Sequence, residues 1–133
     1  MQNNAYKSDE LFVMIKNYLA SGDGKDSVKK VGGIYQMDIL DQKGGKVVRV
    51  WTIDLKNGTG LCKEGAPEKY DALFTMTDDD FLSICTGKLN PQMAFIQGKM
   101  KIKGSMPLAT KFTPDLFPKY SPENVAKYAK AKL

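Results

Sequence analysis

The sequence contains no histidine among its 133 residues. Histidine is the usual general acid or base near neutral pH and the commonest zinc ligand. Its absence excludes a Cys–His or Ser–His catalytic pair and every metal site that uses histidine. The two cysteines, Cys62 and Cys85, are too few to complete a closed zinc site on their own. Much hydrolytic and metal-dependent chemistry is thereby removed, and we expect no catalytic residue, no metal and no cofactor.

Long apolar runs are missing as well. None approaches the roughly 20 residues that a helix needs to cross a bilayer, and residues 1–4 lack the apolar region of a secretory signal. We therefore expect a soluble protein in a reducing compartment, with both cysteines as free thiols. The composition, 42% hydrophobic and 26% charged, is typical of an ordered globular protein. The length fits a single domain over residues 1–133.

Basic side chains outnumber acidic ones. The chain has 20 Lys and Arg against 15 Asp and Glu, for a formal net charge of +5. Such an excess favours acidic partners: nucleic acid, anionic membrane surfaces or acidic small ligands. Charge alone does not distinguish these partners, and a role in keeping the protein soluble explains the excess of basic residues equally well.

Hydrophobic periodicity predicts an α+β domain. Apolar residues at spacings of three and four predict helices, and alternation of apolar with polar residues predicts strands. Helices are expected near residues 8–19, 26–31, 77–87, 90–98 and 106–112 and from 121 to the tail, and strands near 35–39, 47–55, 61, 72–76 and 100–103. The first three strands should form an antiparallel meander, and helices should cover one face of the sheet. The two prolines between Thr113 and Tyr120 predict an extended segment there.

Two helix starts are predicted from local capping residues. Ser8 is expected to cap the first helix. Thr77 is expected to cap a later one, with Asp80 at the reciprocal position of a capping box. The run from Asp78 to Asp80 also admits a metal or paired-carboxylate interpretation. Its place at a helix start favours capping and stabilisation by the helix dipole instead.

Three stretches resemble the sterol carrier protein-2 family. They are Thr77–Leu82, the long run Gly87–Gly104 with Asn-Pro-Gln near its start and Gln-Gly-Lys near its end, and Lys30–Tyr35 before the first strand. The order of the expected elements also fits that family from Leu11 to Phe112. The resemblance implies a five-stranded, mostly antiparallel sheet covered on one face by about five helices, which enclose an apolar lipid tunnel.

The same resemblance implies a function. Family members bind and transfer fatty acids, fatty acyl-CoA, sterols and phospholipids, and are not enzymes by themselves. We therefore expect a monomeric intracellular lipid carrier of broad specificity, which touches anionic membranes transiently. The segment Thr113–Tyr120 resembles the family poorly and is expected near the tunnel mouth.

A lipid tunnel needs apolar side chains that face inward, and methionines can adapt to chains of different shape. A compact core would satisfy the same positions equally well. The residues predicted to line the tunnel are Phe12, Ile15, Leu19, Trp51, Met76, Phe81, Ile84, Met93, Phe95, Ile102, Met106, Leu108 and Phe112.

Basic and amide side chains near the expected edge strand are candidates for head-group contacts. The candidates are Gln97, Lys88, Lys99, Lys101 and Lys103, with Gln92 as a weaker one. The lysines could receive a carboxylate or phosphates, or touch an anionic bilayer. Lysines that protect an edge strand from aggregation explain the same pattern.

The chain ends in Ala131-Lys132-Leu133, the small–basic–leucine form of a peroxisomal targeting tripeptide. It predicts recognition by the peroxisomal import receptor and residence in the peroxisomal matrix.

Two other functions are alternatives to lipid carriage: nucleic-acid binding and acyl-CoA hydrolysis. A nucleic-acid-binding module would need exposed aromatic residues among the lysines, and the sequence does not place them there. An acyl-CoA hydrolase that used Asp78 or Asp80 with Cys85 would lack a histidine as general base. We expect neither nucleic acid binding nor catalysis.

Overall fold

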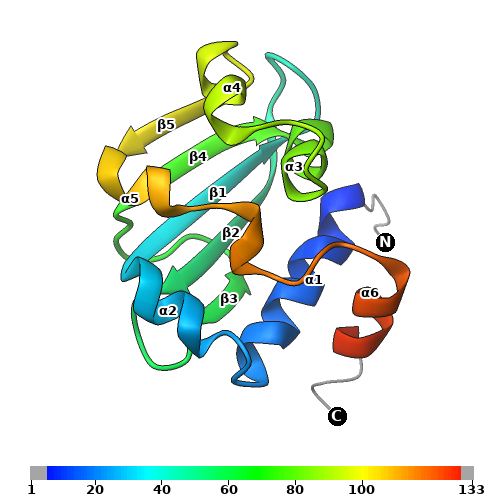
Figure 1. Cartoon of the computed structure of the whole chain (residues 1–133). Helices are drawn as coiled ribbons and strands as arrows, with labels where there is room; N and C mark the ends of the chain where they lie inside the picture. Colours follow the sequence, from blue (N-terminus) through cyan, green and yellow to red (C-terminus); the bar gives the residue numbers. More distant parts are fainter. Residues whose placement is uncertain (1–5, 130–133) are drawn as a thin grey trace.

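The computed structural model describes residues 6–129. Within that range six α-helices and one short 3-10 helix accompany five strands, which confirms the α+β class (Figure 1). The elements in chain order are α1 (Lys7–Ala20), α2 (Lys25–Val31), β1 (Gly33–Leu40), β2 (Val47–Leu55), β3 (Leu61–Glu64), β4 (Ala72–Thr77), α3 (Asp78–Cys85), α4 (Pro91–Ile96), β5 (Met100–Gly104), α5 (Met106–Lys111), η1 (Pro114–Leu116) and α6 (Pro122–Ala129). None of the helices between residues 6 and 129 combines the length and apolar character that crossing a bilayer requires.

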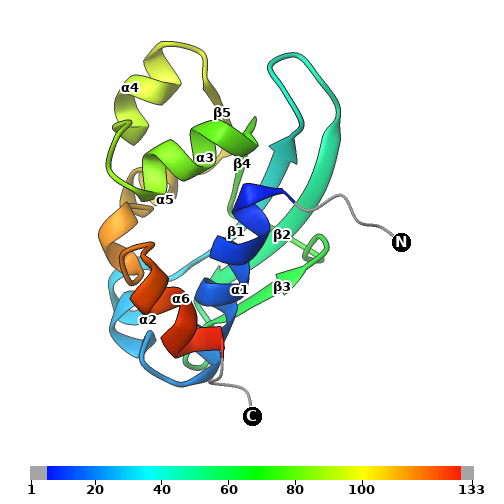
Figure 2. The same cartoon turned by 90° about the vertical axis from the view of Figure 1, so that its right-hand side faces the viewer.

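The strands form one mixed sheet in the order β3-β2-β1-β4-β5. β1, β2 and β3 pair antiparallel as the predicted meander, and β5 pairs antiparallel with β4 at the opposite edge. β1 and β4 are parallel, with Tyr35 opposite Ala72. The sheet is therefore mostly antiparallel, as expected, and β5 is an edge strand. The helices gather on one face of this sheet (Figures 1 and 2).

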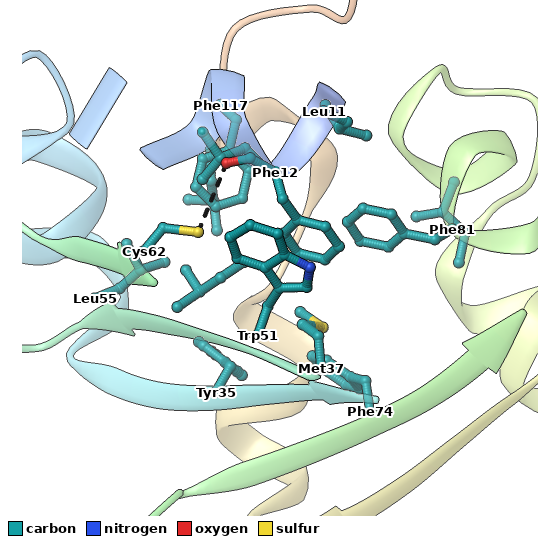
Figure 3. Packing of buried hydrophobic residues seen from close by; sticks show 14 of the residues in the cluster. Leu11, Phe12, Tyr35, Met37, Trp51, Leu55, Cys62, Phe74, Phe81 and Phe117 are labelled. Atoms are coloured by element: carbon teal, nitrogen blue, oxygen red, sulfur yellow. Dashed lines mark hydrogen bonds between the residues drawn. The ribbon is translucent and has the colours of Figure 1, made fainter. Parts of the chain in front are cut away.

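The core lies between α1 and the sheet. Phe12 of α1 stacks on Trp51 of β2, with ring centroids 4.7 Å apart, and on Phe81 of α3, with centroids 4.6 Å apart (Figure 3). Phe12 is completely buried. The three parallel rings bind α1, α3 and the sheet into one body, and stacked aromatic pairs add to the free energy gained from burial.

The start of α1 differs from the prediction. The helix begins at Lys7, so Ser8 lies inside its first turn and is not its cap. The carboxylate of Asp78, at the start of α3, accepts hydrogen bonds from the Lys7 amide at 3.1 Å and the Ser8 amide at 2.8 Å. Because this partner lies 70 residues away in sequence, the local pattern could not reveal it. Thr77 does cap α3, since its hydroxyl accepts a hydrogen bond from the Asp80 amide at 3.1 Å.

Asp78→Ala is expected to destabilise the fold by about 1–2 kcal/mol, because two amides at a helix start lose a charged acceptor. Asp78 is buried, with 7% of its surface exposed. Asp79→Ala is the matched control, since the Asp79 side chain is 81% exposed and forms an ion pair with Lys7 at 3.5 Å. We expect that control to cost less than about 0.5 kcal/mol. Urea denaturation measures both, and equal losses would contradict the capping role of Asp78.

The segment between Thr113 and Tyr120 is not simply extended. It contains the 3-10 turn η1, and its residues Leu116 and Phe117 are buried in the core. The hydroxyl of Ser27 in α2 donates a hydrogen bond to the Leu116 carbonyl at 2.7 Å. The expectation of an extended segment was therefore wrong at its centre. Tertiary burial of the two apolar side chains holds a turn that the prolines alone do not specify.

Candidate functional site

An apolar groove of about 510 Å³ lies between α4, the edge strand β5, α5 and the residues that follow α5. Its volume is in the range of small-molecule sites, about 300–1,000 Å³. The groove is lined by Asn90, Pro91, Gln92, Phe95, Ile96, Met100, Ile102, Met106, Ala109, Thr110, Phe112, Thr113 and Pro114. No charged side chain is among these residues, so the groove suits an uncharged, apolar ligand segment.

A small inner cavity of about 20 Å³ lies behind the groove. The two spaces share Pro91, Met100, Ala109 and Phe112 in their walls. The inner cavity adds Phe74 and Met76 of β4 and Phe81 and Ile84 of α3. The shared wall residues thus separate an open groove from an apolar space between α3 and the sheet.

Local sequence explains the walls of the groove. Alternation along β5 directs Met100 and Ile102 toward the helices and the intervening Lys101 away from them. α4 begins at Pro91 because the Asn90 side chain accepts hydrogen bonds from the next two free amides, at 2.8 and 3.2 Å.

A long-range hydrogen bond helps to hold α5, which contributes Met106, Ala109 and Thr110 to the groove. α5 starts with the Ser105 hydroxyl accepting from the Leu108 amide at 3.2 Å. The hydroxyl of Tyr35 in β1 donates to the Leu108 carbonyl, which ties α5 to the sheet. Tyr35 is completely buried, and that burial raises the pKa of its phenol. The phenol therefore stays protonated and remains a hydrogen-bond donor at every physiological pH.

The structure distributes eleven of the thirteen predicted tunnel residues over three places. Four line the groove, namely Phe95, Ile102, Met106 and Phe112, and the last of these also borders the inner cavity. Met76, Phe81 and Ile84 line the inner cavity. Phe12, Ile15, Leu19 and Trp51 lie in the packed core. Met93 is 46% exposed on α4, and Leu108 packs beside Gly33. Whether a ligand touches any of them remains a prediction.

Of the predicted head-group candidates, only the weaker one, Gln92, lines the apolar groove. Lys99 and Lys101 instead line a second, more polar pocket of about 440 Å³ between β5 and the turn that joins β1 to β2. Lys88, Lys103 and Gln97 are exposed and line neither space. The targeting tripeptide Ala131-Lys132-Leu133 lies outside the described residues.

Several groove residues were not in the predicted set. Met100 could have been found from its alternation with the lysines of β5, and Ala109 from its helical spacing with Met106 and Phe112. Asn90, Pro91 and Thr110 carry no local sign of lining a site. Thr113 and Pro114 begin the segment that was expected near the tunnel mouth, and they reach the groove because the chain turns back across β5 after α5.

Both cysteines are free thiols, as predicted. Cys62 is 1% exposed, and its thiol lies 3.8 Å from the Phe12 carbonyl oxygen, to which it donates a weak hydrogen bond (Figure 3). Burial raises the pKa of the Cys62 thiol to about 12. Because the thiolate is the reactive form, this cysteine is inert near neutral pH.

Cys62 is expected to contribute to alkaline destabilisation. The folded thiol has a higher pKa than the unfolded one, about 8.5, so folding favours the protonated form. Stability from this group is complete below about pH 8.5 and falls by up to about 1.4 kcal/mol per pH unit as pH rises toward the folded pKa. Urea titrations at a series of pH values should give Cys62→Ala a shallower decline than wild type. Parallel declines would show that the thiol does not titrate as burial requires.

The fold and the groove together define a small α+β domain with an apolar groove beside an edge strand. Residues 15–116 match the model of the SCP-2 sterol transfer family. The chain belongs to this family of lipid-transfer proteins.

Three curated relatives illustrate the family. The chain is 46% identical over 121 residues to sterol carrier protein 2 of Arabidopsis thaliana, an alignment that covers 91% of this chain and 98% of that protein. It is 43% identical over 109 residues to sterol carrier protein 2 of Homo sapiens, covering 82% of this chain and 20% of that protein. It is 42% identical to peroxisomal multifunctional enzyme A of Dictyostelium discoideum, covering 81% of this chain and 24% of that enzyme. The chain thus spans nearly all of the plant relative and about a fifth to a quarter of the other two.

Two solved structures share the fold. Sterol carrier protein 2 from Yarrowia lipolytica, in its apo form, superposes with a TM-score of 0.73 at 29% identity, covering 86% of this chain and 92% of that one. Sterol carrier protein-2 from Aedes aegypti, solved in complex with the C16 fatty acid palmitate, gives a TM-score of 0.64 at 32% identity, covering 85% and 96%. The second structure holds a fatty acid in the same kind of fold.

Proposed function

We propose that this protein carries single lipid molecules, whose apolar part enters the groove and extends toward the inner cavity. The observation that carries the proposal is that the two apolar spaces are adjacent and share Met100, Ala109 and Phe112 as a common wall. Each buried methylene contributes about 0.8 kcal/mol, so a 16-carbon chain offers roughly 12 kcal/mol before the costs of binding. Much of that gain is lost to immobilisation, which leaves an affinity on the order of micromolar.

A long acyl chain needs more room than the inner cavity of about 20 Å³ offers. Entry therefore requires the wall residues to move. Met100 suits this task, because an unbranched thioether can change rotamer at little cost. We infer that the groove is the entrance to a tunnel that opens when a lipid enters.

The proposed ligands are long-chain fatty acids, fatty acyl-CoA, sterols and phospholipids. Binding by burial discriminates poorly, because a methylene does not reveal which lipid carries it. The palmitate bound by the mosquito relative supports the fatty acid among them. A charged head group would stay outside the uncharged groove, near the lysines that flank it.

The wider role is proposed from the sequence and the relatives. We propose one domain over residues 1–133 that acts as a monomer, without catalysis or cofactor of its own and without nucleic acid as a partner. The import receptor would recognise the tripeptide 131–133 and direct the protein to the peroxisomal matrix, where it supports lipid oxidation. The name of the Dictyostelium relative, a peroxisomal multifunctional enzyme, agrees with use in that organelle. Transient contact with anionic membranes would allow lipids to be exchanged.

Native mass spectrometry of the purified protein tests the carrier function. We expect a mass increase of one lipid per chain with palmitate, palmitoyl-CoA or a sterol, removed by delipidation and restored by addition. A protein that takes up none of the three would refute the carrier proposal while leaving the fold intact.

A further inference from the structure

The positive charge of this protein is concentrated in one segment. Residues 81–114 contain five lysines and no Asp or Glu. The other 99 residues carry 15 basic and 15 acidic side chains, which balance. The whole formal net charge of +5 therefore resides in the segment that forms most of α3, α4, β5 and α5. Its five lysines are Lys88, Lys99, Lys101, Lys103 and Lys111, and none of them forms an ion pair within residues 6–129.

Of the eight large apolar side chains that are exposed among residues 6–129, this segment carries four, including the most exposed one. Ile96 is 73% exposed, Met93 46% and Phe95 43%, although α4 is only six residues long. Met106, at the start of α5, is 43% exposed. Packing in the core does not account for the apolar character of these side chains, because Ala94 is the only buried residue of α4. Clustered exposed apolar residues with charged neighbours mark an interaction surface.

The part of this segment around α4 lies at one end of the molecule, and α5 lies farther from that end (Figure 1). α4 and the turn between β1 and β2 occupy the same end in both views, and the C-terminus lies at the other (Figures 1 and 2). The second pocket joins them, since it is lined by Lys43, Gly44 and Gly45 of that turn and by Lys99 and Lys101 of the β5 region. Asp80 is the one acidic residue in its wall. The apolar tip of α4 is thus flanked by a basic cleft on one side and by the lipid groove on the other.

We propose that this α4 end docks on the surface of an anionic lipid bilayer. Met93, Phe95 and Ile96 would enter the interface between head groups and acyl chains, while the lysines contact lipid phosphates. The basic cleft formed by Lys43, Lys99 and Lys101 would receive a phosphate of the bilayer. The proposal deepens the carrier function proposed above and rests on it for its purpose. With the groove facing the membrane, a lipid can pass between bilayer and protein without crossing water.

Charge and apolarity together select a bilayer over a protein partner. A protein surface that buried Ile96 would have to supply carboxylates to match five separate lysines. An anionic bilayer supplies many mobile phosphates beside an apolar interior, which matches both features at once. A lysine close to such a surface contributes about a fivefold increase in partitioning.

Sedimentation with vesicles tests the proposal directly. The delipidated full-length protein should bind vesicles of equimolar phosphatidylcholine and phosphatidylglycerol, and not vesicles of phosphatidylcholine alone. Raising the ionic strength from about 0.1 to about 1 M shortens the screening length from about 10 to about 3 Å and should release most of the protein. Lys88→Glu with Lys99→Glu should weaken binding at least about twentyfold, and Ile96→Ser about tenfold.

Matched controls use exposed residues elsewhere on the molecule. Lys29→Glu with Lys30→Glu reverses two exposed lysines of α2, and Leu61→Ser removes a side chain that is 49% exposed on β3. Both control proteins should bind vesicles within about threefold of wild type. Orientation can be measured separately, because fluorescence from Ile96→Trp should be quenched by brominated lipid while that from Leu61→Trp should not. Equal losses in test and control variants would overturn the proposal.

The docking and carrier proposals fail in different ways. Lys43→Glu alters the basic cleft without touching a candidate head-group residue. It should weaken vesicle binding at least about fivefold and leave palmitate binding in vesicle-free solution unchanged. A wild-type protein that binds palmitate but no vesicles would refute docking alone, and one that binds vesicles but no lipid would refute carriage alone. The wild-type protein could instead bind no vesicles and form a dimer that Ile96→Ser dissociates. That result would show that the α4 end binds a second copy of the chain, and it would refute docking on a bilayer.

Discussion

Ala109→Phe is expected to weaken palmitate binding more than a hundredfold. Ala109 is 7% exposed and lies in the wall shared by the groove and the inner cavity. A phenyl ring at this position would fill the boundary between the two spaces, which the lipid is proposed to cross. Excluding only four methylenes from burial costs about 3 kcal/mol, which corresponds to more than a hundredfold in the dissociation constant. Native mass spectrometry or displacement of a fluorescent fatty acid measures the loss.

The stability of this variant must be measured beside its affinity. Overpacking a buried site typically costs about 1–3 kcal/mol, which leaves a domain of ordinary stability folded. Ala126→Phe is the matched control, because Ala126 is exposed on α6. It should bind palmitate as wild type does. Wild-type affinity in a folded Ala109→Phe protein would show that the lipid does not pass from the groove to the inner cavity.

Phe12→Ala is expected to produce the largest loss of stability, about 3–5 kcal/mol. The ring is completely buried and stacks on two others, with interplanar angles of 7° to Trp51 and 5° to Phe81. Its removal leaves a cavity in contact with α1, α3 and β2 and ends both stacking contacts. Since small domains are stable by about 5–15 kcal/mol, this loss is a large fraction of the total. The midpoint of urea denaturation reports it.

The neighbouring residue provides the control for this prediction. Val13 lies next in α1 and is 42% exposed, so Val13→Ala should change stability by less than about 0.5 kcal/mol. Phe12→Ala also separates a core role from a tunnel role. If Phe12 belongs to the core alone, the folded variant should bind palmitate with nearly wild-type affinity. A loss of affinity as large as that of Ala109→Phe would place Phe12 in the tunnel.

The two substitutions address the main ambiguity of the sequence, which is that core and ligand site use the same residue types. Phe12 and Phe95 are equally apolar and both lie at helical spacings, yet Phe12 is fully buried and Phe95 is 43% exposed beside the groove. Periodicity locates a face of an element, and it does not say whether that face meets another element or an open space.

Interactions close in sequence were predicted well. The Thr77 cap, the Asn90-Pro91 helix start and the alternation of β5 involve residues within three positions of one another. The antiparallel meander follows from short turns, which leave neighbouring strands little choice of partner. The family resemblance added the rest of the topology, including a sheet with five strands.

By itself, then, the sequence determined the α+β class, the order of elements and the family, because these depend on local patterns and on long matching motifs. The tertiary structure alone decided the parallel pairing of β1 with β4, the capping of α1 by Asp78 and the turn held at Leu116. It also decided which apolar residues surround empty space and that the exposed α4 lies at the same end of the molecule as the turn between β1 and β2. Each of these depends on contacts between residues far apart in the chain, which only the packed fold brings together.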